Sequence, residues 1–342
     1  LFKKFNLLAG ARRGSPLALG LSDKSTYIGS DSLALAPFTQ KIIFMSEGDS
    51  VIIEKNKIMI FDKNFRKVKR EVVMSSFSGS NLDKGNFNHF MQKEIFEQPL
   101  IIGDSLSRFM DPINKKINIS DLKIKWKNLK KIELIACGTS YYACQVATYW
   151  FEKYLQISAN AYLASEFRYK TYIKSTGTLS IFISQSGETA DTLAALKYAK
   201  ENKSKIFSIV NNSESSIARE SDYYLTIAAG PEIGVASTKA FTSQLSVLAC
   251  LCLIGGRERG TLKSEQEKKL TENLLEVPSN MSLVFDLTNQ IKKISKLIVK
   301  ANSVLFLGRG SLFPIALEGA LKLKEISYIH AEGYASGEMK HG

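Results

Sequence analysis

Long hydrophobic runs are missing from this sequence of 342 residues. A membrane-spanning helix needs about 20 consecutive apolar residues. The longest apolar stretch, from Leu245 to Ile254, is interrupted by Ser246 and ends at Gly255, so we expect a buried helix there and no membrane association. The opening residues, Leu1 to Lys4, also lack the shape of a secretory signal. Because the sequence starts without Met and stops at Gly342 inside a polar loop, we expect a fragment of a longer protein.

Cysteine is scarce as well, with four residues in the whole sequence. So few cysteines in a chain of this size do not indicate a disulfide framework. Cys250 and Cys252 are separated by one residue within an apolar helical stretch, so they point to different sides and make a poor zinc pair. We therefore expect buried free thiols in a reducing, cytoplasmic compartment, with no metal site and no cofactor.

Negative charge is in deficit, because 46 basic and 33 acidic residues give a net charge of +13. Such an excess can indicate a nucleic-acid partner or an anionic surface. Here the lysines are scattered and no basic motif is interleaved with aromatic residues, so we expect no nucleic-acid binding. The positive field suits a small anionic ligand equally well.

The composition changes along the chain and indicates separate regions. The first third is rich in β-strand candidates punctuated by Gly and Asp turns, and it is followed by a Ser-, Gly-, Asn- and Lys-rich stretch. We predict a β-rich unit over 1–75, a linker with a connecting helix over 76–120, a first α/β unit over 121–280 and the truncated start of a second one over 281–342.

From about residue 130 onward, strand and helix patterns alternate. Strands are expected at Lys131–Ala136, Thr178–Ser184, Lys205–Val210 and Tyr223–Ile227, each followed by a polar loop, and a further strand at Ser303–Leu307 opens the last region. Strand–loop–helix units at this spacing predict an α/β fold, with a parallel sheet flanked by helices.

Two of these loops carry hydroxyl groups at the edge of the sheet where ligands bind. Ser184–Thr189 offers hydroxyls, an amide and a flexible Gly directly before a helix, and Thr139 and Ser140 offer two more hydroxyls at an equivalent place. Free amides and the positive helix end suit a phosphate dianion. Ser and Thr are also ordinary N-caps, so a single such loop is more often a cap than a site. Because two such loops lie on one sheet edge, the interpretation as helix caps and the interpretation as a phosphate site both stay open.

A second candidate site lies on the last predicted helix. Glu318, Lys322 and Glu325 follow an i, i+4, i+7 spacing and therefore share one face. Periodicity alone favours a solvent-exposed ion pair on this face. A carboxylate and an ammonium on one rigid face could also move a proton between adjacent carbons of a sugar. His341, in a polar loop flanked by glycines, can serve as an acid or base or be structural, and both roles stay open.

Several motifs in this order are specific. They are Cys137–Ser140, Ile183–Thr192, Glu232–Phe241, Leu317–Glu325, Ser327–Glu332 and Lys340–Gly342. Together they resemble the isomerase half of the glutamine–fructose-6-phosphate aminotransferase family, also called glucosamine-6-phosphate synthases. Upstream, Arg13–Leu17, Ser30–Asp31 and Phe61–Lys63 look like the end of that family's N-terminal-nucleophile glutaminase domain, and Met91–Ile95 with Glu97–Pro99 looks like its connector.

The resemblance implies a sugar-isomerase (SIS-type) fold and a role for each matched residue. Glu325 would be the base that moves a proton between C1 and C2, assisted by Lys322 and Glu318. His341 would open the sugar ring and reach into the site of a partner subunit, which implies a homodimer. The sugar phosphate would be held by Thr139, Ser140, Ser184, Gln185, Ser186 and Thr189, and the sugar would be lined by Val235, Ala236 and Ser237.

The implied reaction converts fructose 6-phosphate and glutamine to glucosamine 6-phosphate and glutamate, the first step of amino-sugar biosynthesis. The family's N-terminal nucleophilic cysteine has no counterpart, since the first cysteine is Cys137, and its Schiff-base lysine would fall after Gly342. We therefore expect glutamine to be used by a missing N-terminal part. The alternatives are a stand-alone phosphosugar isomerase or deglycase, and a sugar-phosphate sensor of the SIS type.

Overall fold

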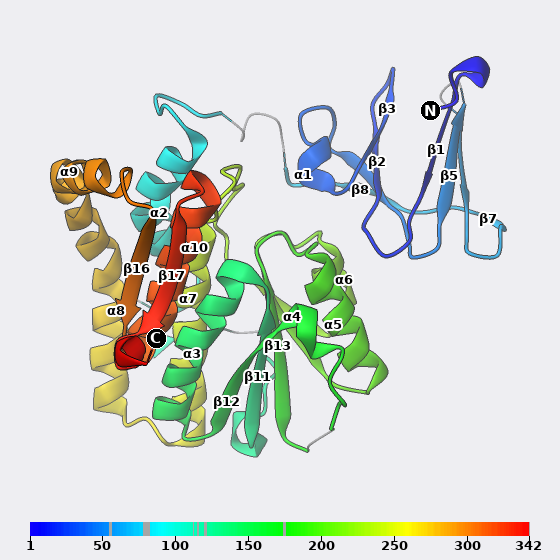
Figure 1. Ribbon diagram of the computed structural model, residues 1–342. Coiled ribbons are helices and arrows are strands. Elements are labelled where there is room, and N and C mark those ends of the chain that lie inside the picture. The colour runs from blue at the N-terminus through cyan, green and yellow to red at the C-terminus, as the bar shows by residue number, and fades with distance from the viewer. Residues whose placement is uncertain are drawn as a thin grey trace.

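The chain folds into an N-terminal β unit and a larger α/β body (Figure 1). The computed structural model describes residues 1–54, 57–77, 83–111, 113–114, 116–119, 122–173 and 176–341. The predicted α/β class is confirmed, and the first region is β-rich as expected.

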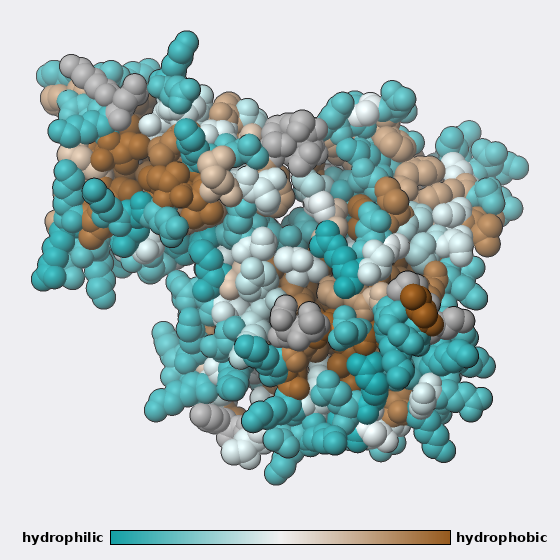
Figure 2. Space-filling view, turned by 180° about the vertical axis from the view of Figure 1, so that it is seen from behind, coloured by the Kyte–Doolittle hydropathy of each residue, from teal (hydrophilic) through white to brown (hydrophobic). Residues whose placement is uncertain are grey.

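The N-terminal unit consists of antiparallel sheets. One sheet has the order β1-β5-β6-β7, formed by β1 (Leu7–Ala11), β5 (Ser50–Glu54), β6 (Lys57–Phe61) and β7 (Lys67–Val68). The other has the order β3-β2-β4-β8, formed by β3 (Thr26–Gly29), β2 (Ala18–Leu21), β4 (Lys41–Phe44) and β8 (Val72–Met74), with the short helix α1 (Ser32–Leu35) beside it. Apolar side chains such as Leu19, Met45 and Val51 fill the space between them. Figure 2 shows further hydrophobic side chains gathered on the surface of this unit.

The α/β body is built on a parallel sheet in the order β12-β11-β13-β14-β15. Its strands are β11 (Lys131–Ala136), β12 (Ser158–Leu163), β13 (Thr178–Ser184), β14 (Ile206–Val210) and β15 (Tyr223–Thr226). The central strand β13 is almost entirely buried, which is typical of a parallel strand covered on both faces. The intervening helices are α3 (Gly138–Leu155), α4 (Ala164–Phe167), α5 (Ala190–Glu201), α6 (Ser216–Glu220) and α7 (Lys239–Arg259).

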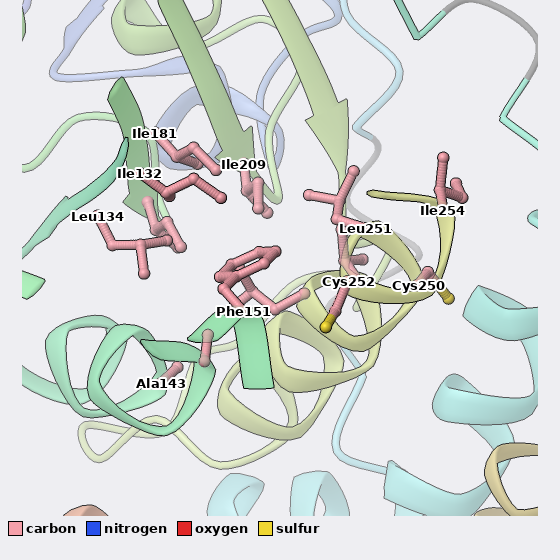
Figure 3. Close-up of a cluster of buried hydrophobic side chains, with 14 of the residues drawn as sticks. Ile132, Leu134, Ala143, Phe151, Ile181, Ile209, Cys250, Leu251, Cys252 and Ile254 are labelled. Atoms are coloured by element: carbon pink, nitrogen blue, oxygen red, sulfur yellow. The ribbon is translucent and has the colours of Figure 1, made fainter. Parts of the chain in front are cut away.

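One face of the sheet packs against α3 and α7, and Figure 3 shows Phe151 lying between sheet residues and Leu251 of α7. On the other face, Phe182 packs with Leu193, Leu196 and Ile217. The helix α7 is long and apolar enough to cross a membrane by composition, but most of it is buried inside the structure, as expected of a core helix.

Helix α2 (Phe90–Ser107), in the region predicted to connect the units, packs on α7 and on α8 (Ser264–Val284). Its residues Ile102 and Leu106 are fully buried in the main core. Two short strands follow it, β9 (Met110–Asp111) and β10 (Lys116–Ile117). The connecting helix is therefore part of the α/β body.

The last region contains α9 (Thr288–Ile298), β16 (Ser303–Gly308), α10 (Phe313–Ser327) and β17 (His330–Ala335). β16 and β17 pair in parallel and α10 connects them, so these elements form a second, small α/β unit. Helix α10 packs on its own strands and also on α3 of the first unit. This second contact brings α10 to the edge of the first sheet.

Phe151 tests the importance of the main core. It is fully buried between the sheet and α7, so Phe151→Ala should lower the free energy of unfolding by about 3 to 5 kcal/mol. Urea unfolding followed by circular dichroism would measure the loss. Tyr149→Ala on the same helix removes a ring that is 43% exposed, so its loss should be clearly smaller, and it serves as the control. Equal losses in the two variants would contradict the packing described.

Candidate active site

The parallel strands β11 and β13 end at one edge of the sheet, and the loops that follow them lead into α3 and α5. The first turn of each helix therefore points its free backbone amides toward the same region. This edge carries all the residues predicted to hold a phosphate.

The loop after β13 is organised by its own hydroxyl groups. The hydroxyl of Ser184 is buried, lies 2.9 Å from the hydroxyl of Thr189 and accepts a hydrogen bond from the Gly187 amide at 3.0 Å. Ser186 is exposed, and its hydroxyl accepts from the Glu188 amide at 3.1 Å. Gly187 adopts a φ of +67°, and a Cβ there would collide with Ser215. The loop therefore needs glycine at this position.

The cap interpretation of these hydroxyls does not fit the structure. Among the described residues, the N-cap positions Thr189 of α5 and Cys137 of α3 make no side-chain cap hydrogen bond. The first amides of α3 and α5 are thus not capped by the side chains of these N-cap residues.

Ser140 and Gln185, both predicted to hold the phosphate, make hydrogen bonds within the protein. The hydroxyl of Ser140 is buried and accepts a hydrogen bond from Gln244 of α7 at 2.9 Å, so it helps to join α3 to α7. Gln185 is half-buried, and its backbone carbonyl accepts from the Asn211 amide at 3.1 Å. Both lie at the predicted edge, but the structure directs the Ser140 hydroxyl inward.

Helix α10 brings its charged face to the start of α3. The Thr139 hydroxyl donates to Glu318 at 3.1 Å and accepts from the Lys322 ammonium at 2.9 Å. Lys322 lies 3.4 Å from Glu318 and 2.8 Å from Glu325. Residues about 180 positions apart in the sequence thus form one cluster.

Burial distinguishes the two carboxylates of this cluster. Glu318 is only 6% exposed, and burial raises its pKa to about 7 despite the opposing effects of Lys322 and Thr139. Its second oxygen has no hydrogen-bond partner among the described residues. The Glu325 side chain is 35% exposed and reachable from solvent. The interpretation of this face as a solvent-exposed ion pair is therefore wrong for Glu318.

The loop before α7 begins at the same sheet edge, after β15, and its three predicted sugar residues lie in different surroundings. Val235 is 91% exposed, whereas Ala236 is fully buried. The Ser237 hydroxyl donates to Glu232 at 2.7 Å, and the same carboxylate accepts from the Thr238 amide at 2.7 Å. Of these three residues, Val235 is therefore the one with an exposed side chain.

His341 is separated from the cluster within one chain. Glu325 lies near the end of α10, where β17 begins, whereas His341 follows the opposite end of β17 and is exposed. Figure 1 shows the C-terminus at that far end. The structure therefore does not bring His341 to Glu325 of the same chain.

Sequence reasoning missed three residues at this edge. Tyr142 lies one turn after Thr139, and burial together with the charges of Glu318 and Glu325 raises its pKa. Glu232 holds the loop before α7, and Glu94 of α2 accepts hydrogen bonds from the same loop. The only sequence signal for Glu232 and Glu94 is that each is an acidic residue within a motif that carries the resemblance.

Comparisons with known proteins agree with this geometry. The SIS domain family matches residues 127–254 and 297–342, which include both hydroxyl-rich loops and α10. Over 98% of this chain, the sequence is 51% identical to a glutamine–fructose-6-phosphate aminotransferase (isomerising) from Bradyrhizobium diazoefficiens. It is 49% identical over its full length to the protein of the same description from Zymomonas mobilis. The chain spans about half the length of these relatives, 56% in each case.

A solved structure gives the same result. The C-terminal domain of glucosamine-fructose-6-phosphate aminotransferase from Francisella tularensis superposes with a TM-score of 0.73 at 43% identity. The match covers 76% of this chain and 73% of that one. The sheet with its two hydroxyl-rich loops and the start of the second α/β unit lie within the residues matched by the family. The chain belongs to the SIS domain family.

Proposed function

We propose that this chain carries the sugar-phosphate isomerase part of an enzyme that converts fructose 6-phosphate and glutamine to glucosamine 6-phosphate and glutamate. The observation that carries the proposal is the cluster of Thr139, Glu318, Lys322 and Glu325 at the phosphate-suited edge of the sheet. The names of relatives at about 50% identity, glutamine–fructose-6-phosphate aminotransferases (isomerising), support the same reaction.

The phosphate would bind at the starts of α3 and α5. Amides at a helix N-terminus and the positive end of its dipole favour an anion. Ser186 and Thr189 add hydroxyl donors, and Ser184 holds the loop in shape through its bonds to Gly187 and Thr189. Hydroxyls and amides in place of lysines suit a phosphate that must leave again after each turnover.

The proton transfer would be carried out by Glu325. Its carboxylate takes the proton from one of the two adjacent carbons, C1 or C2, and returns it to the other, so that no proton is gained or lost overall. Lys322, 2.8 Å from Glu325, keeps this carboxylate in place and can donate to a sugar oxygen. Because Glu318 is held partly neutral near pH 7, it leaves the Lys322 charge available to Glu325 and the substrate.

His341 would act on the substrate of a neighbouring subunit. It lies at the end of β17 remote from Glu325, so ring opening at this site needs the histidine of a second copy, and we propose a homodimer. Glutamine hydrolysis would be the task of sequence outside these 342 residues, since the first cysteine is Cys137. The four free cysteines fit a reducing compartment, and we propose that the protein works in the cytoplasm.

A stand-alone phosphosugar isomerase or deglycase is the alternative function. It would use the same cluster but would not need the N-terminal β unit. That unit contacts the α/β body through Arg12 and Ser216, and through Glu47, which pairs with Lys197 at 3.3 Å. The relatives' similarity also includes it, because the match covers 98% of the chain or more. Both observations favour the aminotransferase.

Ser186 offers a direct test of phosphate binding. The loss of one hydrogen bond to a charged phosphate should raise the dissociation constant of fructose 6-phosphate about tenfold in Ser186→Ala. Calorimetric titration of the chain would measure it. Ser213→Ala removes an exposed hydroxyl at the same sheet edge but outside the phosphate loop, and should bind like the wild type. No saturable binding by the folded wild type would contradict the proposal.

Glu325→Gln should strongly slow proton transfer while leaving the phosphate contacts in place. In heavy water, deuterium incorporation from solvent into fructose 6-phosphate, measured by mass spectrometry, should slow by about 100-fold or more. The affinity for fructose 6-phosphate should change by less than about threefold. Glu332→Gln, an equivalent change at an exposed carboxylate of β17, is the control. Equal exchange by the wild type and Glu325→Gln would exclude Glu325 as the base.

Glu318 makes stability depend on pH in a defined direction. Its folded pKa of about 7 exceeds the unfolded value near 4.5, so between these values the folded chain binds a proton that the unfolded chain releases. The protonated Glu318 therefore contributes its full share to the free energy of unfolding below about pH 4.5, and this share is lost as the pH rises to 7. Urea midpoints across this range should fall more steeply for the wild type than for Glu318→Gln. Parallel curves would show that Glu318 ionises normally.

A further inference from the structure

The loop between β15 and α7, residues 227–238, is held from both ends. At its start, Asn211 of the neighbouring loop donates to the Gly230 carbonyl at 2.6 Å and accepts from the Ala229 amide at 2.9 Å. At its end, Glu232 accepts from Ser237 and Thr238. The tip, with Val235, is left as the most exposed part of the loop.

A third support comes from helix α2. One oxygen of the Glu94 carboxylate accepts from the Ile233 amide at 2.6 Å and from the Gly234 amide at 3.0 Å. Glu94 is only 2% exposed, and its other oxygen has no hydrogen-bond partner among the described residues. One turn later, Glu97 pairs with the buried Lys239, the first residue of α7, at 2.9 Å. Helix α2 thus binds the 227–238 loop through Glu94 directly before Val235, and it contacts the start of α7 through Glu97.

Gly234 allows the loop backbone to approach helix α2 closely. A Cβ at this position would lie 2.5 Å from the unpartnered Glu94 oxygen and 3.3 Å from the Cα of Met91. Only glycine therefore lets the loop backbone reach the carboxylate. Hydrogen bonds to an ionised carboxylate are about twice as strong as neutral ones. Two such bonds to the buried Glu94 carboxylate therefore hold the backbone of Ile233 and Gly234 close to helix α2.

We propose that Glu94 is a positioning residue that sets the sugar-contacting loop and thereby governs recognition of the sugar, not of its phosphate. The inference rests on the proposed function and on the role that the family resemblance implies for this loop, in which Val235, Ala236 and Ser237 line the sugar and Val235 has the exposed side chain. The phosphate would be held by other elements, the starts of α3 and α5. Loss of Glu94 should consequently weaken binding of a sugar phosphate while leaving the affinity for phosphate alone almost unchanged.

The test compares two ligands and two readouts. Fructose 6-phosphate and inorganic phosphate are titrated separately into the 342-residue chain, its Glu94→Ala and Glu94→Gln variants, and Asp104→Asn. The last is an acid-to-amide change at an exposed position of the same helix. Hydrogen–deuterium exchange of the peptide covering Ile233 and Gly234 reports on the loop without any ligand.

In Glu94→Ala, the dissociation constant of fructose 6-phosphate should rise about tenfold, with that of phosphate within about twofold of the wild type. Glu94→Gln keeps an acceptor oxygen, so its dissociation constant for fructose 6-phosphate should lie between those of the wild type and Glu94→Ala. Asp104→Asn should bind both ligands like the wild type. Both Glu94 variants should exchange faster at Ile233 and Gly234. Equal losses for the two ligands, or unchanged affinity for fructose 6-phosphate, would overturn the inference.

Failure of the proposed function would be recognised separately. If the folded wild type bound neither ligand, the assignment of the site to a sugar phosphate would be wrong. The exchange rates would then decide the role of Glu94 by themselves. Faster exchange confined to the loop would support the positioning role, and unchanged exchange in Glu94→Ala would overturn it.

Discussion

The candidate site depends on one contact between two α/β units, the meeting of Thr139 at the start of α3 with Glu318 and Lys322 on α10. Phosphate-suited amides belong to the first unit and the carboxylates belong to the beginning of the second. Neither set would form a catalytic site alone. Because α10 is also anchored by its own strands β16 and β17, the contact fixes both the distance and the direction of the Glu325 carboxylate.

The loop after β13, Ser184–Thr189, is also tied to the N-terminal unit. Glu188, directly before Thr189, accepts from the Ser216 amide of α6 at 2.8 Å, and burial raises its pKa. The Ser216 hydroxyl in turn lies 3.4 Å from the buried Arg12 guanidinium of the N-terminal unit. A continuous chain of polar contacts therefore links this loop to a unit that contributes no residue to the cluster of Thr139, Glu318, Lys322 and Glu325. Such a link couples the shape of the loop to the position of the unit.

Much of this arrangement could be predicted from sequence, because it follows from local pattern. The alternation of strands and helices predicted the sheet, and the spacing of Glu318, Lys322 and Glu325 predicted a shared face. What that face packs against could not be read from periodicity, so the burial of Glu318 was missed. Ser140 was placed at the right edge, but its hydroxyl turns to Gln244, 104 positions away. Contacts between distant segments leave no local signal.

Glu94 shows why some supporting residues escape sequence reasoning. It lies 139 positions before Ile233 and near the start of helix α2, where a glutamate normally faces solvent. A buried carboxylate costs free energy unless hydrogen bonds compensate for its lost hydration. Here two loop amides do so, and these amides would themselves be unsatisfied without it. Helix and loop thus satisfy each other's hydrogen bonds. Under the proposed function, this mutual dependence would let Glu94, a residue outside the reacting cluster, set the shape of the loop that contacts the sugar.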